Sequence, residues 1–164
     1  KQFAAHTAER TYNAIVWGKP APASGTIEGA IGRDPRNRKR MAVVHSGGKD
    51  ARTHYITRAA SGLGAALLEC RLETGRTHQI RVHMAETSWP LIGDPLYGRA
   101  SKARRDRLKD AALDAAQGFQ RQALHAATLG FVHPLTSEIL NFESPLPNDM
   151  DALLKALGIT LSGK

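Results

Sequence analysis

Residues 74–84 place two arginines, two histidines and a glutamine within eleven positions of this chain. Arg76 and Arg81 are always charged, and their planar donor groups suit phosphate or carboxylate. A segment that contains glycine and proline follows closely at residues 91–98. A lone arginine in a helix is more often a structural salt bridge, but this density of polar groups indicates a functional site.

Residues 77–87 have the periodicity of a helix, and this helix would position the polar side chains. If Thr77 caps it, polar and apolar side chains fall on different sides. One side carries His78, Arg81 and Ala85, and the other carries Ile80 and Met84. Arg81 would then be half buried on a rigid element, where an arginine needs an anionic partner.

Metal and nucleophile chemistry fit this sequence poorly. His78 and His83 are five positions apart, about 140° around a helix, so they cannot grip one ion as an i,i+4 pair does. Cys70 is the only cysteine, and its place in the middle of a strand favours a buried, unreactive thiol. There is no Gly-x-Ser-x-Gly turn, phosphate-binding loop or dinucleotide fingerprint. The sequence therefore predicts neither a metal nor a cofactor.

Tyr12 is a second candidate site residue because the chain has few aromatic side chains, 5% of its residues. A tyrosine in the middle of a strand is usually a core residue whose hydroxyl reaches a polar edge. The functional alternative is a stacking platform for an unpaired base, which an aromatic ring stabilises by about 1–3 kcal/mol.

The charge of the chain favours a polyanionic partner. Its formal net charge is +8, and nucleic acid is the most common partner of so basic a domain. Two clusters hold much of the positive charge. The first contains Arg33, Arg36, Arg38, Lys39 and Arg40, and the second, at residues 99–109, includes Arg104 and Arg105. Either cluster alone could be a solvated face, but together they favour contact with phosphates.

Hydrophobic periodicity predicts mostly strands, followed by helices late in the chain. The predicted strands are residues 11–17, 26–31, 41–45, 53–59, 65–73, 125–132 and 138–142. Residues 33–40 are predicted to be a basic loop, and residues 46–50 a hairpin-like turn. The later predicted helices are residues 101–117, with Ser101 as N-cap and Gly118 as the stop, and residues 149–157. This order indicates an α+β domain with an antiparallel or mixed sheet.

Length and composition set further expectations. The 164 residues fit one domain, residues 1–164, with 41% hydrophobic and 23% charged residues, as in an ordinary soluble globule. No apolar run reaches the length of a membrane span, and the first residues do not resemble a signal peptide. A single cysteine gives no sign of an oxidising compartment. We therefore expect a cytoplasmic monomer.

Several motifs follow one another along nearly the whole chain. They are residues 10–18; the basic segment 33–41 with 48–55; residues 74–83 with 92–98; and residues 121–126, 131–134 and 144–147. In this order they resemble the RNA pseudouridine synthases, specifically the type that acts on large-subunit ribosomal RNA. The resemblance implies an α+β fold with a mixed, mainly antiparallel sheet and flanking helices. It also implies breakage of the C1′–N1 bond of uridine and formation of a C1′–C5 bond, with no cofactor or metal.

The resemblance also implies roles for individual residues. Tyr12 would stack on the target base and help to remove the proton from C5. Arg81 would pair with the catalytic aspartate, while Arg76 and His78 would line the entrance and touch the RNA backbone. The RNA-binding set would be completed by Arg33, Arg36, Arg38, Lys39, Arg40, Arg104 and Arg105.

The chain departs from the family pattern in one respect. The first motif of the family, His-Arg-Leu-Asp, is absent, and every aspartate of the chain lies in another context. Residues 1–6 resemble the end of the helix that follows that motif. We therefore expect the C-terminal part of a catalytic domain, in which Arg81 lacks its anion, a sheet edge or core face is open, and the chain alone is inactive on RNA.

Two other functions remain open at this point. The chain could be a non-catalytic RNA-binding module that uses the same basic surface. Binding to another polyanion, such as a membrane surface, is weaker because the cationic segments have no apolar stripe. The choice of RNA over DNA depends on the resemblance, and the sequence leaves the target uridine open.

Overall fold

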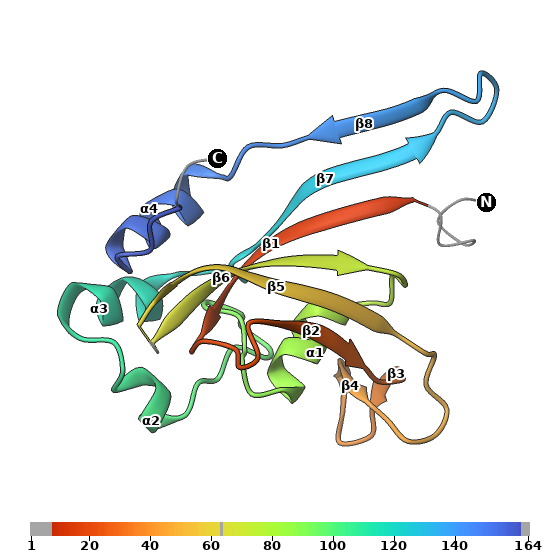
Figure 1. Cartoon of the computed structure of the whole chain (residues 1–164). Helices are drawn as coiled ribbons and strands as arrows, with labels where there is room; N and C mark the ends of the chain where they lie inside the picture. The colour runs from red at the N-terminus through yellow and green to blue at the C-terminus, as the bar shows by residue number, and fades with distance from the viewer. Residues whose placement is uncertain (1–7, 63, 162–164) are drawn as a thin grey trace.

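A six-stranded antiparallel sheet organises this computed structural model, which describes residues 8–62 and 64–161 (Figure 1). The strands are β1 (Glu9–Trp17), β2 (Ser24–Glu28), β3 (Ile31–Asp34), β4 (Asn37–Val43), β5 (Arg52–Ser61), β6 (Ala65–Leu72), β7 (Leu124–Val132) and β8 (Ile139–Glu143). The helices are α1 (Gln79–Glu86), α2 (Lys102–Arg105), α3 (Asp110–Gly118) and α4 (Asn148–Ala156). The sheet order is β2-β5-β6-β1-β7-β8, and β3 and β4 form a separate hairpin. The predicted α+β class with a mainly antiparallel sheet is confirmed.

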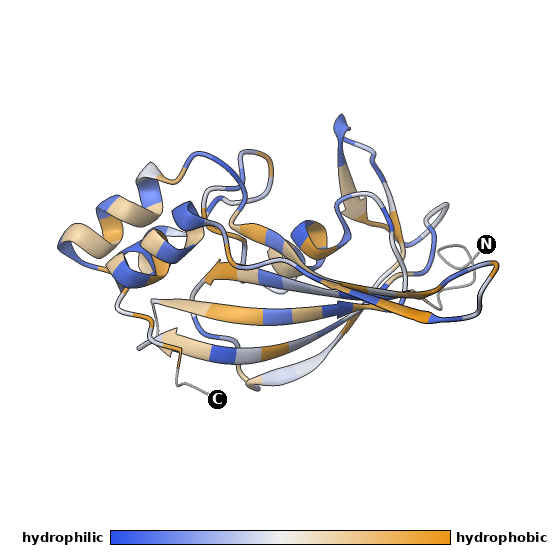
Figure 2. Cartoon of the chain, turned by 90° about the horizontal axis from the view of Figure 1, so that it is seen from above, coloured by the Kyte–Doolittle hydropathy of each residue, from blue (hydrophilic) through white to orange (hydrophobic). Residues whose placement is uncertain are grey.

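Strand β1 lies inside the sheet between β6 and β7, and both of its faces carry apolar side chains. Ala14 and Val16 pack in a cluster with Ile80 and Met84 of α1. Ile15 and Trp17 point to the other face and pack in a cluster with residues of α3 and α4. Figure 2 shows hydrophobic and hydrophilic bands following one another along the strands. The sheet is therefore covered by α1 on one face and by α3 and α4 at one end of the other face.

The predicted basic loop at residues 33–40 is instead the tip of the β3–β4 hairpin. Its turn is closed by side-chain acceptors, since Arg36 N donates to Asp34 Oδ1 and Lys39 N donates to Asn37 Oδ1. The apolar ends of the hairpin pack beneath α1, in a cluster that includes Ile31 and Val82. This packing overrides the weak strand propensity of a charged run. The strand predicted at residues 26–31 is likewise divided between β2 and β3.

The helix predicted at residues 101–117 is also wrong, because it is broken into α2 and α3. Ser101 is the N-cap of α2, and its Oγ accepts a hydrogen bond from Arg104 N. The break turns Leu108 into the core, where it is 5% exposed. A Cβ at Gly64 would lie 2.4 Å from Leu108 Cδ2, so the two segments are in close contact. Burial of this leucine outweighs the helix propensity of the alanine-rich run.

The remaining predicted strands and the terminal helix differ from the structure by a few residues at their ends. The helical end predicted at residues 1–6 lies outside the described residues. No helix in the described part of the chain is both long and apolar enough to span a membrane.

Candidate active site

Arg81 of α1 forms a buried, two-point ion pair with Asp94. Arg81 Nε lies 2.7 Å from Asp94 Oδ2, and Arg81 Nη2 lies 2.8 Å from Asp94 Oδ1. The two side chains are 10% and 0% exposed. The expectation that Arg81 has no anion within this chain is therefore wrong. The turn that follows α1 brings a carboxylate back against the helix.

The turn at residues 91–98 requires glycine at its bend. Gly93 has a φ of +71°, and a Cβ there would lie 2.2 Å from the carbonyl oxygen of Arg121. Both the left-handed backbone and the close approach exclude a larger residue. The bend places the Asp94 side chain against Arg81 of α1.

Asp94 is held as a carboxylate. Burial acts to raise its pKa, but hydrogen bonds from Arg81 and from the backbone N–H groups of Tyr97 and Leu96 outweigh burial and lower the pKa below its usual value. The hydrogen bonds that Arg81 donates to Asp94 raise the pKa of the Arg81 guanidinium in turn. The Nη1 atom of Arg81 makes no hydrogen bond to the described residues. That edge of the guanidinium is available to a second acceptor.

Three predicted site residues, His78, Arg40 and Arg81, meet at Tyr97. Tyr97 belongs to the motif at residues 92–98 but was not itself predicted to be a site residue. Its Oη accepts a hydrogen bond from Met41 N at 2.8 Å and lies 3.0 Å from His78 Nδ1. The guanidinium carbons of Arg40 and Arg81 each lie 5.0 Å from the centre of its ring. Tyr97 therefore connects α1 to the base of the basic hairpin.

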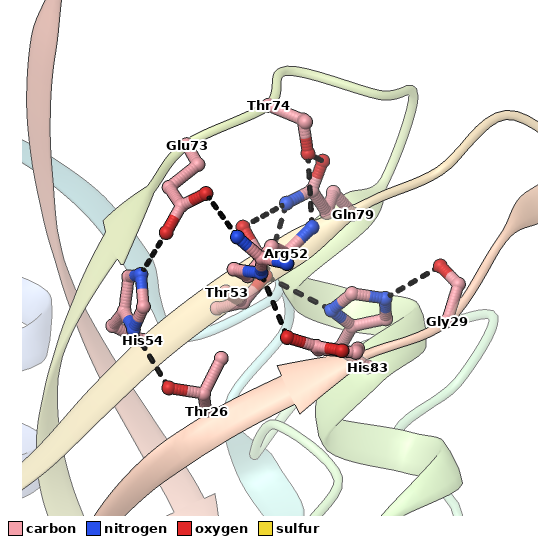
Figure 3. A network of polar contacts seen from close by, with 10 residues as sticks. Thr26, Gly29, Arg52, Thr53, His54, Glu73, Thr74, Gln79 and His83 are labelled. Atoms are coloured by element: carbon pink, nitrogen blue, oxygen red, sulfur yellow. Dashed lines mark hydrogen bonds and ion pairs between the residues drawn. The ribbon is translucent and has the colours of Figure 1, made fainter.

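Gln79 is the buried amide that shapes the loop before α1 (Figure 3). It is 2% exposed, and all of its hydrogen-bonding groups are used. Its Nε2 donates to Arg52 O and Thr53 Oγ1, and its Oε1 accepts from Thr74 Oγ1 and Arg76 N. The amide thus fixes the loop that carries Arg76.

The prediction that Thr77 caps α1 is wrong. The N-cap is His78, with a left-handed backbone of φ 58° and ψ 21° and no side-chain capping hydrogen bond. Instead of a capping side chain, the Gln79 side chain forms hydrogen bonds with Thr74 and Arg76 in the loop before the helix. The predicted division of sides is confirmed, since His78 and Arg81 contact Tyr97 while Ile80 and Met84 enter the sheet core.

His83 is fully buried and lies between β5 and the segment after β2 (Figure 3). Its Nε2 lies 3.3 Å from Gly29 O, and its Nδ1 lies 2.9 Å from Thr53 Oγ1. A carbonyl oxygen only accepts, so Nε2 carries the proton and Nδ1 accepts from the threonine hydroxyl. Burial lowers the pKa of His83. His83 is therefore a neutral structural residue.

We expect the neutral state of His83 to appear in the pH dependence of stability. In the unfolded chain His83 becomes protonated below a pH of about 6.5. In the folded protein its pKa is lower, so it becomes protonated only at a lower pH. The stabilisation is therefore complete above that pH and declines as the pH falls. The free energy of unfolding in urea, measured from pH 7.5 to 5 for the wild type and His83→Gln, checks this.

His83→Gln is expected to be about 1–3 kcal/mol less stable at pH 7.5, because the buried Thr53 and Gly29 groups lose partners. The difference between the two proteins should shrink towards pH 5. A difference that stays constant over this range would contradict the assignment.

An exposed set of ion pairs lies beside the buried amide in Figure 3. Arg52 pairs with Glu28 and Glu73, and His54 Nε2 lies 2.6 Å from Glu73. These pairs connect β2, β5 and the end of β6. Exposed pairs of this kind contribute little stability, so we assign them no part in the site.

Tyr12 lies in β1 between Cys70 of β6 and Ala126 of β7. Its half-buried ring packs against the cluster that contains Ile80, the residue before Arg81. The ring is therefore on the α1 face of the sheet. No hydrogen bond or ring contact joins Tyr12 to Arg81 among the described residues.

Cys70 carries the unreactive thiol that its position predicts. Its side chain is fully buried, and burial raises the pKa of the thiol to about 12. A thiol in this state is a poor nucleophile.

The remaining predicted RNA contacts fall into two groups. Arg36, Arg38 and Lys39 are exposed at the hairpin tip. Other guanidinium groups bond to carbonyl oxygens of the chain: Arg33 to Arg38, Arg76 to Asp50, Arg104 to Trp17 and Arg105 to Ala100. Among the described carboxylates, none forms an ion pair with a member of either group. Their positive charge is thus not neutralised within the described chain.

Comparison with known proteins gives consistent results. The model of the RNA pseudouridylate synthase family matches residues 1–86. The chain is similar to ribosomal large subunit pseudouridine synthase D of Zymomonas mobilis, with 48% identity over 97% of this chain and 48% of that protein. It is similar to the synthase D of Xanthomonas campestris, with 46% identity over 96% of this chain and 46% of that protein. The chain thus spans about half the length of these curated relatives.

Solved structures show the same fold at lower sequence identity. Human RNA pseudouridylate synthase domain containing 4 has a TM-score of 0.73 and 23% identity, over 99% of this chain and 67% of that chain. Human RNA pseudouridylate synthase domain containing 1 has a TM-score of 0.66 and 24% identity, over 99% and 71%.

Proposed function

Because the chain belongs to the RNA pseudouridylate synthase family, we propose that it supplies most of an active site that isomerises uridine to pseudouridine in large-subunit ribosomal RNA. The observation that carries the proposal is the Arg81–Asp94 pair. It holds a buried guanidinium rigidly on the α1 face of the sheet, with Nη1 available to a further anion. Tyr12 lies on that same face.

The proposed reaction moves one base without gain or loss of atoms. The C1′–N1 bond of uridine breaks, the uracil turns, and a C1′–C5 bond forms while C5 loses a proton and N1 gains one. The target base must first leave its stack. We assign Tyr12 to stacking on the base and to removal of the C5 proton, and Arg81 to orienting the catalytic carboxylate through Nη1.

The catalytic carboxylate itself is proposed to lie outside these 164 residues. The chain has no His-Arg-Leu-Asp motif, and Asp94 already bonds Arg81 and two backbone N–H groups. The 164-residue chain alone is therefore expected to release no tritium from 5-labelled uridine in ribosomal RNA. Turnover by the purified chain would contradict this assignment.

Tritium release also tests the function. A protein that includes the catalytic motif is mixed with large-subunit ribosomal RNA labelled at C5 of uridine, under conditions in which binding of that RNA is measured in parallel. Release with stoichiometric pseudouridine formation supports the synthase. Tight binding with no release by a protein that includes the catalytic motif would favour a non-catalytic RNA-binding module.

The tip of the β3–β4 hairpin is the proposed phosphate-binding surface. Arg36→Gln with Arg38→Gln removes two exposed charges that have no carboxylate partner in the described chain. Each lost phosphate contact lowers the salt dependence of binding by about 0.7–0.9 in log–log slope. We expect the slope to fall by about 1.5 and the RNA affinity to fall about tenfold at 0.1 M salt.

The control removes the same charge elsewhere. Lys19→Gln with Lys155→Gln alters two exposed lysines away from the hairpin. RNA affinity is measured for both double variants at several salt concentrations. The comparison distinguishes the loss of a local phosphate contact from the effect of a lower net charge. Equal losses in the two variants would contradict a hairpin site.

A further inference from the structure

The hydroxyl group of Tyr97 has one consistent set of hydrogen bonds. The residue is 5% exposed. Met41 N donates to its Oη, so the hydroxyl proton must point to another acceptor. Among the described residues, the acceptor within hydrogen-bond distance is His78 Nδ1, 3.0 Å away. The proton of neutral His78 is then on Nε2, since Nδ1 accepts from Tyr97.

The charges around this pair favour the same arrangement. Arg40 and Arg81 both lie over the Tyr97 ring, and Asp94 forms its ion pair with Arg81. Protonation of His78 would add a third cation and would leave the Tyr97 hydroxyl proton with no acceptor. Burial and the charge of Arg81 lower the pKa of His78, and Asp94 opposes them only in part. The imidazole is therefore neutral at physiological pH.

The backbone conformation of His78 is also unusual. Its φ of 58° is in the left-handed region, which residues other than glycine adopt at a cost. The Nε2 atom makes no hydrogen bond to the described residues, and the side chain is partly exposed. One edge of the imidazole is thus fixed by Tyr97 while the opposite edge is open.

We propose that Tyr97 is a positioning residue, which fixes His78 as the neutral Nε2–H tautomer so that Nε2–H donates to an acceptor oxygen of the RNA. The assignment of RNA as the ligand rests on the proposed function. The tautomer and charge of the imidazole do not depend on that function, so they are measured separately.

The first test is nitrogen-15 NMR of the imidazoles in the protein and in Tyr97→Phe. The wild type should show His78 with an unprotonated Nδ1, a protonated Nε2 and a pKa below 6.5. Tyr97→Phe keeps the ring that Arg40 and Arg81 contact, and should give mixed tautomers and a pKa nearer 6.5. Tyr55→Phe is the matched control, because its buried hydroxyl donates to Pro22 O instead.

The second test is turnover on RNA, measured in a protein that includes the catalytic motif. Tyr97→Phe should lower kcat/KM about tenfold, as loss of one oriented hydrogen bond does, whereas Tyr55→Phe should leave it unchanged. His78→Asn tolerates the left-handed backbone and offers Tyr97 an oxygen acceptor, but has no donor at the Nε2 position. Its loss should match that of Tyr97→Phe, and the double variant should be no worse than either.

The outcomes separate the positioning role from the function. A wild-type His78 with its proton on Nδ1, or an unchanged imidazole in Tyr97→Phe, would overturn the positioning role. Altered imidazole signals with unchanged turnover, or additive losses in the double variant, would overturn its part in the reaction. If the wild-type protein that includes the catalytic motif does not turn over, the proposed function fails while the NMR result stands. If Tyr97→Phe does not fold, the wild-type tautomer and His78→Asn decide.

Discussion

Replacement of Arg81 by alanine is expected to abolish turnover by a protein that includes the catalytic motif and to destabilise the fold by about 3–5 kcal/mol. Asp94 is 0% exposed at its side chain, and without the guanidinium its charge would be buried with two backbone N–H groups as its remaining partners. Urea denaturation and tritium release from labelled RNA measure the two effects.

A double variant separates the structural from the catalytic part of this loss. Arg81→Met with Asp94→Asn removes both charges, and the asparagine oxygen still accepts from Leu96 and Tyr97 N–H. It should recover most of the stability but no turnover. Arg81→Ala with stability within about 1 kcal/mol of the wild type would argue against the buried pair. Turnover by the double variant would argue against Arg81 as the residue that orients the catalytic carboxylate.

In a protein that includes the catalytic motif, Tyr12→Phe is expected to lower turnover by about 100-fold or more while RNA affinity changes little. Proton transfer by a positioned group contributes about 10²–10⁴-fold to a rate, and the substitution removes only the hydroxyl. The phenyl ring keeps its packing against the cluster of Ile80 and Met84 and its stacking surface for the base. Single-turnover rates and equilibrium binding on the same RNA measure both quantities.

Tyr55→Phe again provides the control, since it also removes one tyrosine hydroxyl but on a side chain bonded to Pro22 O. Tyr12→Leu removes the ring as well and should weaken RNA binding in addition to turnover. Unchanged turnover with reduced affinity in Tyr12→Phe would favour the RNA-binding module over the synthase.

Local pattern in the sequence determined much of this fold. The alternation of β1 divides its side chains between two faces, because successive side chains in a strand point to opposite sides. One face meets α1 and the other meets α3 and α4. The helical period likewise predicted that Arg81 and His78 share a side away from Ile80. The motifs identified the family before any contact was known.

Tertiary packing decided what these residues touch. Arg81 meets Asp94 because a left-handed bend at Gly93 returns the chain to α1. The alanine-rich helix breaks because Leu108 gains burial, and the basic run forms strands because the ends of the hairpin pack under α1. Tyr97 joins segments more than fifty residues apart through one hydroxyl. Such contacts depend on the relative placement of distant elements, which the periodicity of any single segment does not encode.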